Sequence, residues 1–468
     1  MAGPQIIWFR QDLRLADQAA VRAAASAGPV LGVYVLDEAS KGVRPMGGAS
    51  RWWLHHSLAA LDARLRTLGG ALHLQRGPSA RVLAGLVAET GAVAVHALRH
   101  AEPWWPAIEA AVPRLVLHEG VTLAPTGLLK TQTGGPFRMF TPFWRAHAAF
   151  GRPPAPRPAP AFLAFADAPP GDRLAQWKLL PDSPNWAKHF DWTPGETGAR
   201  AALDAFLPRL EAYDARRNFP SEAATSSLSA HLHFGEISAA QCWHAAVVAA
   251  GAAATPWTRQ LVWRDFAHEA VVQFPDSATR AHRAQFERMP WTDVTQGTGA
   301  ALLKAWQDGR TGYPLVDAGM RQLWATGWMH NRVRMVVASF LVKHLLIDWR
   351  EGERWFWDTL VDADLPNNAM GWQWVTGSGV DSAPYFRIFA PTGQSRKFDA
   401  GDYVRRWVPE LAGLSGDLVH GPFERGFGGY PPPIVEHRFA RERALAACAD
   451  MKAPTESQPR AGSSRACQ

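Results

Sequence analysis

The sequence predicts an α/β domain with a doubly wound parallel sheet, followed by an all-α domain. Residues 1–120 alternate short apolar segments with stretches of helical spacing, a pattern typical of parallel sheets. A Pro/Ala-rich region follows, and from about residue 199 the apolar residues recur at i, i+3 and i+4. We therefore expect the α/β domain at 1–125, a connection at 126–198, the helical domain at 199–453 and a disordered tail at 454–468.

Five apolar segments of four to seven residues predict the sheet: 5–9, 30–36, 71–75, 93–98 and 114–119. Helical stretches such as 50–69 separate them. No GxGxxG motif follows the first segment, and no GxxxxGK[ST] motif occurs. The Gly-Ser-Gly at 377–379 lies far downstream, without a strand–helix unit around it. The sheet therefore carries neither nucleotide-binding fingerprint.

The connection contains the Pro/Ala-rich stretches 152–162 and 165–172, which cannot form regular hydrogen-bond ladders. Beyond it, four stretches predict helices: 198–218, 237–250, 256–274 and 316–346. The tail is small and polar, a composition typical of disorder.

The composition of the chain argues against several classes of protein. Hydrophobic residues make up 47% and charged residues 19%, as in globular chains, and no run of about 18 apolar residues predicts a membrane helix. The three cysteines are scattered without a CxxC pair, which argues against disulfide frameworks and metal sites and fits a reducing cytoplasm. A formal net charge of +7 is compatible with nucleic acid, as it is with any Arg-rich protein.

Residues 359–389 are the most informative segment. Burial of Asp and Asn costs several kcal/mol without partners, so their mixture with tryptophans indicates a flat ligand with polar edges. The alternative is a surface loop with an Asp helix cap. The polar and aromatic residues of this segment are Asp362, Asp364, Asn367, Asn368, Trp372, Trp374 and Arg387. Because residues two apart on a helix point about 200° apart, Trp372 and Trp374 are expected to serve different surfaces.

Two helical stretches carry binding-site candidates. Trp257, Gln260 and Arg264 share one helix face, with Trp263 beside it. The alternative is a partly exposed helix with an extended Arg side chain. On 316–346, Asn331 and Met335 project together and Arg334 turns to the adjacent face. A buried Asn beside Met suits an apolar ligand with one polar edge; the alternative is a core helix with a polar margin.

The hydroxyl-rich segment 225–229 predicts an anion site. Ser/Thr side chains and free backbone N–H groups at a helix start suit a pyrophosphate. The alternative is a simple N-cap.

With these motifs in hand, the chain resembles the DNA photolyase/cryptochrome family, and within it the bacterial cyclobutane pyrimidine dimer photolyases. The resemblance runs from IIWFRQDLRL at residue 6 to YPPPIVEH at residue 430. It is strongest in 311–353, in LVDADLPNNAMGWQW (360–374) and in APYFRIF (383–389). It implies an N-terminal antenna domain and an all-α FAD-binding domain that holds a folded FAD.

The resemblance also implies residue roles. Asn368 would lie beside the flavin N5, and no metal is implied. The other FAD-binding residues would be Tyr213, Thr225, Ser226, Ser227, Leu228, Ser229, Trp257, Gln260, Arg264, Arg334, Asp362 and Asp364. The lesion and DNA contacts would be Arg217, Gln260, Trp263, Asn331, Arg332, Met335, Trp374 and Arg387. An electron-transfer chain from flavin to surface would consist of Trp372, Trp349 and Trp306.

The implied reaction is light-driven repair of pyrimidine dimers in single- or double-stranded DNA, by electron transfer from excited reduced FAD. The implied protein is a monomer in the cytoplasm, at the nucleoid. Glu102 resembles the acid that holds a folate antenna, methenyltetrahydrofolate; a solvated loop Glu is the alternative.

The chain departs from the dimer-specific pattern at Gln260, where most bacterial relatives carry Glu. Gln at this position is typical of six-four photoproduct photolyases, but these carry histidines where this chain has Asn331 and Met335. We therefore expect dimer repair, weakened but not abolished by Gln260. The alternatives are a six-four photolyase, a cryptochrome-type blue-light receptor and a DNA-binding protein without photochemistry.

Overall fold

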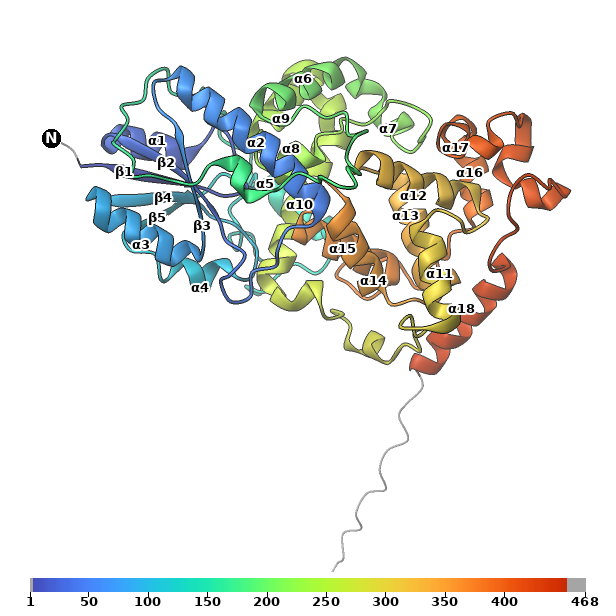
Figure 1. Ribbon diagram of the computed structural model, residues 1–468. Coiled ribbons are helices and arrows are strands. Elements are labelled where there is room, and N and C mark those ends of the chain that lie inside the picture. Colours follow the sequence, from blue (N-terminus) through green and yellow to red (C-terminus); the bar gives the residue numbers. More distant parts are fainter. Residues whose placement is uncertain (1–2, 453–468) are drawn as a thin grey trace, which may run out of the picture.

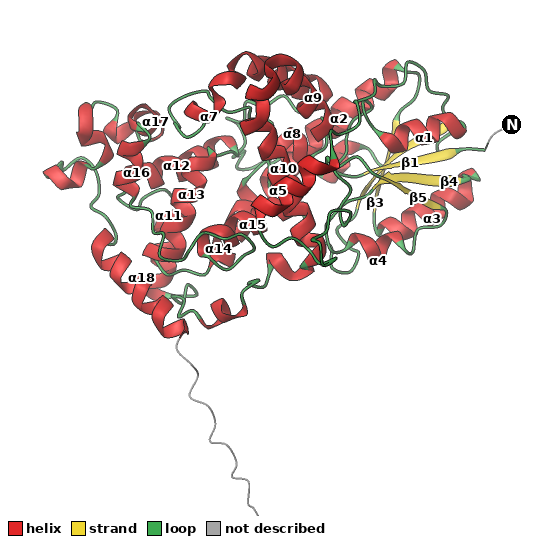
Figure 2. Cartoon of the chain, turned by 180° about the vertical axis from the view of Figure 1, so that it is seen from behind, coloured by secondary structure: helices red, strands yellow, loops and turns green. Residues whose placement is uncertain are grey.

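A computed structural model describes residues 3–452, so the predicted tail lies outside the described residues. The α/β domain contains five parallel strands in the order β3-β2-β1-β4-β5. This confirms the predicted parallel sheet. Figure 2 shows the strands, in yellow, gathered at one end of the molecule. The strands are β1 (Gln5–Phe9), β2 (Val30–Leu36), β3 (Leu72–Arg76), β4 (Ala94–Leu98) and β5 (Leu115–His118).

Helices cover both faces of the sheet: α1 (Ala19–Ala27), α2 (Gly48–Thr67), α3 (Ser79–Thr90) and α4 (Trp105–Glu109). Because successive strand residues point to opposite faces, β1 contributes to two cores. Ile7 and Phe9 pack in a core with α1 and α2, whereas Ile6 and Trp8 pack in a core with α3 and α4. A strand that is buried on both faces has a continuous run of apolar residues, which explains why the sequence predicted a strand at 5–9.

The connection is more ordered than its composition suggested. It contains the helix α5 (Phe140–Phe150), which the sequence analysis did not anticipate. Phe140 and Phe143 of α5 are buried in the same core as α10 (Thr255–Gln273). The Pro-rich stretches form no strand of their own, but they contact the sheet at two strands: Phe165 forms a bridge with Val30 of β2, and the Asp172 N–H donates to the Leu74 carbonyl of β3 at 2.7 Å.

The second domain is helical, as predicted (Figure 1). Its elements besides α10 are α6 (Glu196–Phe206), α7 (Tyr213–Arg216), α8 (Ser229–His233), α9 (Ala239–Ala250), α11 (Gly297–Gln307), α12 (Pro314–Thr326), α13 (Asn331–Ser339), α14 (Trp349–Thr359), α15 (Leu365–Thr376), α16 (Pro391–Lys397), α17 (Gly401–Trp407) and α18 (His437–Lys452). Across residues 3–452, no helix combines the length and apolar character that a bilayer crossing requires.

The stretch 316–346 is not one helix. Gly327 ends α12 with a left-handed φ of +69°, and a Cβ there would lie 2.8 Å from the Phe190 ring. α13 then starts anew, with Arg332 N–H donating to the His330 side chain at 3.1 Å. A π-helical turn, Phe340–His344, follows α13. The break matters for function because it sets the direction of Asn331 and Met335 independently of α12.

Polar contacts join the two domains. The Glu196 carboxylate accepts hydrogen bonds from the backbone N–H groups of Leu15 and Ala16 at 2.9 and 3.0 Å. Arg14 donates to the Gly235 carbonyl at 3.0 Å. Figure 1 shows one end of α2 reaching the helical domain, where it packs against α14. The N-terminal domain therefore packs directly beside the helices that build the site.

Candidate functional site

A cavity of about 540 Å³ lies inside the helical domain. Its walls come from the 225–229 segment and from α10, α13 and α15. The structure brings most of the predicted site residues to it: Tyr213, Arg217, Thr225, Ser226, Ser227, Leu228, Ser229, Trp257, Gln260, Trp263, Arg264, Asn331, Arg334, Met335, Asp362, Asp364, Asn368, Trp372 and Trp374.

Asp362 combines one paired and one unpaired carboxylate oxygen. Its Oδ2 accepts from Arg334 Nη2 at 2.8 Å, and Arg334 Nε donates to the Met329 carbonyl at 2.7 Å. Asp362 Oδ1 is buried and has no protein donor. Because a buried acceptor without a donor is costly, this oxygen is suited to an N–H group of a ligand.

Asp364 is the N-cap of α15. Its Oδ1 accepts from the backbone N–H and the amide of Asn367 at 2.8 and 2.7 Å. Burial alone would raise the pKa of Asp364, but His233, with Nδ1 3.7 Å from Oδ2, and the nearby positive charges outweigh it. The pKa is therefore held well below its usual range, and Asp364 supplies a permanent negative charge at the cavity.

Asn368 has a fixed orientation. Its Nδ2 donates to both the backbone carbonyl and the carboxylate of Glu353, at 3.1 and 2.9 Å. Two acceptors identify this atom as the amide nitrogen. The amide oxygen takes part in neither bond, so it remains free to accept a hydrogen bond from a donor in the cavity.

The 225–229 segment lines the cavity, but its geometry differs from the expected helix start. α8, which begins at Ser229, has only five residues and no side-chain cap. Ser227 adopts a left-handed φ of +54°. The segment therefore offers hydroxyl groups along a bend, and the simple N-cap alternative is wrong.

The predicted stripe of α10 is present. Trp257, Gln260 and Arg264 all face the cavity, together with Trp263. Arg264 Nη1 donates to the Val121 carbonyl at 2.7 Å and so ties α10 to the end of the α/β domain. The extended-Arg alternative is wrong because this guanidinium is turned inward.

Trp263 is backed by a ring that sequence reasoning missed. Phe140 of α5 stacks on it with ring centroids 3.6 Å apart and planes 7° apart. The contact joins residues 123 positions apart in the chain, so no local pattern could have revealed it. Its consequence is a Trp263 ring with one face covered and held in place.

Asn331 and Met335 project together, with Asn331 Nδ2 4.0 Å from the Met335 sulfur. One part of the prediction is wrong, because Asn331 is exposed and not buried. It follows the break after α12 and lies at the first position of α13, where solvent reaches it. The pair therefore belongs to the open side of the cavity.

The expectation that Trp372 and Trp374 serve different surfaces is wrong as stated, because both line this cavity. Their opposed directions are nevertheless visible in their surroundings. Trp372 is buried among Trp306 and Phe356, with ring centroids 6.2 and 5.0 Å away, whereas Trp374 is only half-buried. The cavity therefore borders more than one face of α15.

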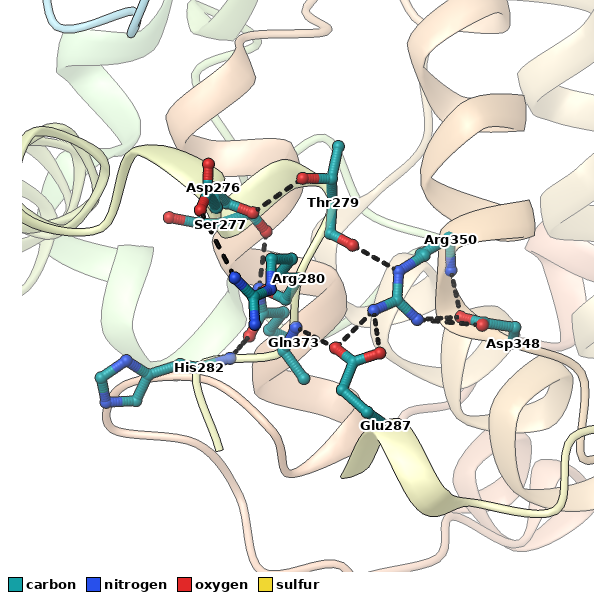
Figure 3. A network of polar contacts seen from close by, with 10 residues as sticks. Asp276, Ser277, Thr279, Arg280, His282, Glu287, Asp348, Arg350 and Gln373 are labelled. Carbon is teal, nitrogen blue, oxygen red and sulfur yellow. Dashed lines mark hydrogen bonds and ion pairs between the residues drawn. The ribbon is translucent and has the colours of Figure 1, made fainter. Parts of the chain in front are cut away.

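Gln373, between the two tryptophans, anchors α15 from behind. Its amide donates to the carbonyls of Ser277 and Arg280 at 2.6 and 2.9 Å and accepts from His282 N–H at 3.0 Å (Figure 3). In the same network, Arg350 of α14 bridges Asp348 and Glu287. These contacts fix the rotation of α15 about its axis.

The predicted route from flavin to surface is wrong at its end. Trp306 is fully buried, donates its indole N–H to the Val337 carbonyl at 3.0 Å and packs directly beside Trp372. Trp349 is also buried. Neither ring reaches solvent, because both belong to the same buried core as Trp372, so Trp306 cannot be the surface terminus.

Three further predicted residues lie outside the cavity wall. Arg332 donates to the Asn218 side chain at 2.7 Å and covers the Phe398 ring. Arg387 is exposed. Glu102 is buried and accepts from the Trp105 indole at 2.9 Å, so the solvated-loop alternative for Glu102 is wrong. Burial, together with the charge of Asp364, raises the pKa of Glu102.

Several cavity residues were not predicted, among them Asn218, His233, Trp328 and Met370. Asn367, which was named among the polar residues of 359–389 but given no role, also lines the cavity. His233 ends the five-residue helix α8, and Trp328 lies in the connection between α12 and α13. Only the folded chain determines the direction of these two short segments.

FAD fits this cavity by several observations. An ionised Asp364 and an unpaired Asp362 oxygen suit N–H groups of its rings, and Asn368 presents an oxygen. Apolar rings from α10 and α15 suit its flat faces. Among the described residues, no group of histidine, cysteine and acidic side chains could hold a metal ion.

Comparison with known proteins follows the same division of the chain. Residues 5–161 match the family described as "DNA photolyase", and residues 257–450 match "FAD binding domain of DNA photolyase". The "Deoxyribodipyrimidine photo-lyase" of Agrobacterium fabrum is 47% identical, over 97% of this chain and 99% of that protein.

The crystal structure of a bacterial class III photolyase from Agrobacterium tumefaciens superimposes with a TM-score of 0.90 and 46% identity, over 97% of this chain and 98% of that one. "Cryptochrome-1" of Arabidopsis thaliana is 35% identical over 96% of this chain, but only 70% of that longer protein is covered.

Proposed function

This chain belongs to the DNA photolyase family, and we propose that it is a deoxyribodipyrimidine photo-lyase, which repairs cyclobutane pyrimidine dimers in DNA under blue light. Bound FAD, when reduced and excited by light, supplies the electron that opens the cyclobutane ring. The observation that carries the proposal is that the predicted flavin residues line the same cavity as most of the predicted lesion residues. Cofactor and damaged bases can therefore lie in contact.

The flavin side is assigned to Asp362, Arg334, Asn368 and Asp364, with Trp257 and Tyr213 as further walls. The Asp362–Arg334 ion pair offers a ligand both an acceptor and a positive charge. Fixed polar groups of this kind bind and orient a cofactor without reorganisation. The segment 225–229 is assigned to the phosphates and the ribityl chain.

The lesion side is assigned to Trp263, Gln260, Asn331, Met335 and Trp374. Two crosslinked thymines are flat and apolar, with amide edges, so stacking on rings and hydrogen bonds from amides suit them. A crosslinked dimer stacks and pairs poorly in the duplex, and its extrusion costs less than that of normal bases. Gln260 also donates to the Pro256 carbonyl at 3.1 Å, which leaves its amide oxygen for the lesion or the adenine.

Trp372 is assigned to electron transfer toward oxidised flavin, because it lines the cavity and contacts a buried aromatic core. The acidic and basic groups of a conventional hydrolytic site are not required. What the protein contributes is contact between cofactor and lesion, with water excluded.

Two alternatives are less well supported. Six-four repair lacks the histidines expected at Asn331 and Met335. A light receptor of the cryptochrome type is supported by the similarity to the Arabidopsis protein, but identity to the photo-lyase is higher and coverage of that protein is nearly complete.

We further propose a partner, an oligomeric state, a location and an antenna chromophore for the protein. Damaged DNA is the partner, with Arg217, Arg332 and Arg387 as phosphate contacts, and the protein acts as a monomer in the cytoplasm at the nucleoid. The antenna chromophore is methenyltetrahydrofolate, near Glu102, on the resemblance alone. Chromatography of the chromophores released by denaturation tests the folate; a released deazaflavin would contradict it.

The decisive experiment uses the full chain loaded with FAD and reduced beforehand. It is illuminated with blue light in the presence of single-stranded DNA containing one thymine dimer. We expect loss of the dimer in the light and none in the dark. A matched oligonucleotide with a six-four photoproduct serves as the control. Repair of that control alone, or no repair of either, would overturn the proposal.

A further inference from the structure

We propose that Arg44, in the N-terminal domain, is a positioning residue for the flavin site. It lies in the loop between β2 and α2 and acts through Glu353 on Asn368. The inference rests on the proposed function, which puts Asn368 beside the flavin N5. It assigns to the N-terminal domain a part in the chemistry of the cofactor that is separate from any light harvesting.

The contact between Arg44 and Glu353 is bidentate. Nη1 lies 2.8 Å from Oε1 and Nη2 lies 2.9 Å from Oε2. The Glu353 side chain is 2% exposed, while that of Arg44 is 25% exposed. A guanidinium that uses two parallel bonds fixes the plane of the carboxylate as well as its position.

The fixed carboxylate in turn fixes Asn368. Glu353 Oε1, which Arg44 holds, is also the acceptor for Asn368 Nδ2 at 2.9 Å. The Glu353 backbone carbonyl accepts from the same nitrogen. Both amide hydrogens are therefore used on the side of α14, and the amide oxygen is the atom left for the cavity that Asn368 lines.

Arg44 is itself held firmly against α14. Its guanidinium lies over the Trp357 ring, 4.1 Å from the centroid, and the Trp357 indole donates to the Pro45 carbonyl at 2.9 Å. The loop approaches so closely that a Cβ at Gly47 would lie 2.2 Å from the Trp357 carbonyl oxygen. The ion pair is thus part of a packed contact between the two domains and not an isolated pair of surface charges.

The chemical consequence concerns the proton at N5. Reduced flavin has an N5–H group, which can donate a hydrogen bond to an amide oxygen. In oxidised flavin N5 carries no hydrogen and is an acceptor, which an amide N–H would suit. With Asn368 locked, the site favours the reduced cofactor. When Arg44 is removed, Glu353 loses its orientation, the amide can turn, and the ratio of reduced to oxidised flavin falls.

The test measures the reduction potential of FAD bound to the full chain. For Arg44→Met we expect a fall of about tenfold in the reduced-to-oxidised ratio, or about 30 mV for a two-electron couple. Arg44→Lys keeps the charge and the fold but cannot form two parallel bonds, so we expect a smaller shift in the same direction.

Asp358→Asn is the matched control. The Asp358 carboxylate accepts from Gly48 N–H at 2.8 Å, so it joins the first residue of α2, directly after this loop, to the same helix without contacting Glu353. We expect it to change the unfolding temperature but not the potential. The double variant Arg44→Met/Asn368→Ala should show no shift beyond that of Asn368→Ala, because the two residues act in series.

An unchanged potential in both Arg44 variants would overturn the inference, as would equal shifts in Asp358→Asn or additive shifts in the double variant. The repair assay with the unaltered protein is independent of these measurements. Repair without a potential shift would therefore reject the role of Arg44 alone, and a potential shift without repair would reject the proposed function alone.

Discussion

Trp263 illustrates how a single side chain is prepared for its task. Phe140 covers one face of its ring, so the other face is the one available at the cavity. A ring held in this way loses little conformational freedom on binding, and preorganisation of this kind strengthens stacking.

Replacement of Trp263 by Ala should weaken binding of dimer-containing DNA by about 5- to 150-fold, since stacking on one base is worth about 1–3 kcal/mol. FAD content should not change. Fluorescence anisotropy and the flavin absorbance of the purified variant check the two parts. Trp243→Ala, on α9 and outside the cavity wall, is the control; loss of flavin in Trp263→Ala would contradict the assignment.

Lys343 is an unusual buried cation. It is 1% exposed, forms no ion pair among the described residues and donates to the Arg387 carbonyl at 2.8 Å. Burial, with a smaller effect of Arg387, lowers the pKa of Lys343 to about 7 from its ordinary 10.5. Between these two pH values the unfolded chain binds a proton that the folded chain does not.

Unfolding therefore takes up a proton in this window, and the contribution of Lys343 to stability should rise with pH. Relative to Lys343→Met, the unaltered protein should gain at most about 1.4 kcal/mol per pH unit from about pH 7 toward pH 10, with a flat difference below pH 7. Thermal unfolding of both proteins across this range is the measurement. Parallel pH profiles would show that the Lys343 pKa is not displaced.

At the scale of elements, the approach of α14 and α15 decides where Trp372 lies. A Cβ at Gly352 on α14 would lie 2.0 Å from the Trp372 ring, so the missing side chain makes room for the ring. Gln373, held from behind by the contacts of Figure 3, prevents α15 from rotating away. The helix pair thus acts as one unit.

Gly352→Ala should destabilise the protein by about 1–3 kcal/mol, because a methyl group forced into a packed core displaces its neighbours. It should also slow photoreduction of oxidised flavin. Gly85→Ala is the control, since a Cβ there on α3 meets nothing within 4 Å and a helical Gly→Ala change is stabilising by up to about 1 kcal/mol. A stabilised Gly352→Ala protein would refute this view of the helix pair.

Element boundaries were also where sequence reasoning was weakest. The apolar period of 316–346 continues through Gly327, so periodicity alone joined α12 to α13. The left-handed φ and the close approach of Phe190 become visible only when the chain is folded. α5 was missed for a related reason: its Phe140 and Phe143 pack against α10, far away in sequence.

At the scale of the whole molecule, the proposed DNA contacts are electrostatic. The logarithm of the binding constant should fall linearly with the logarithm of salt concentration, with a slope of about −0.7 per neutralised phosphate on single strands. Arg387→Gln removes one phosphate contact, so it should reduce the magnitude of this slope by about 0.7 and leave dimer specificity unchanged. Filter binding across a salt series tests this, and a slope close to zero would contradict the arginine roles.

The sequence by itself determined the parallel sheet, the helical second domain and most of the cavity wall. These features are written locally, in apolar periodicity and in short segments such as 225–229 and 360–374, and the family resemblance attached chemistry to them. The spacing of the sequence also correctly grouped Trp257, Gln260 and Arg264 on one helix face, because helical spacing is set by backbone geometry alone.

Only the tertiary structure decided which side chains are buried and which distant groups touch. It enclosed Trp306, which removed that ring from the surface, and it exposed Asn331. It brought Phe140 to Trp263 and Arg44 to Glu353 across 123 and 309 positions of the chain. Such contacts depend on how whole elements pack, and no local pattern of residues encodes that packing.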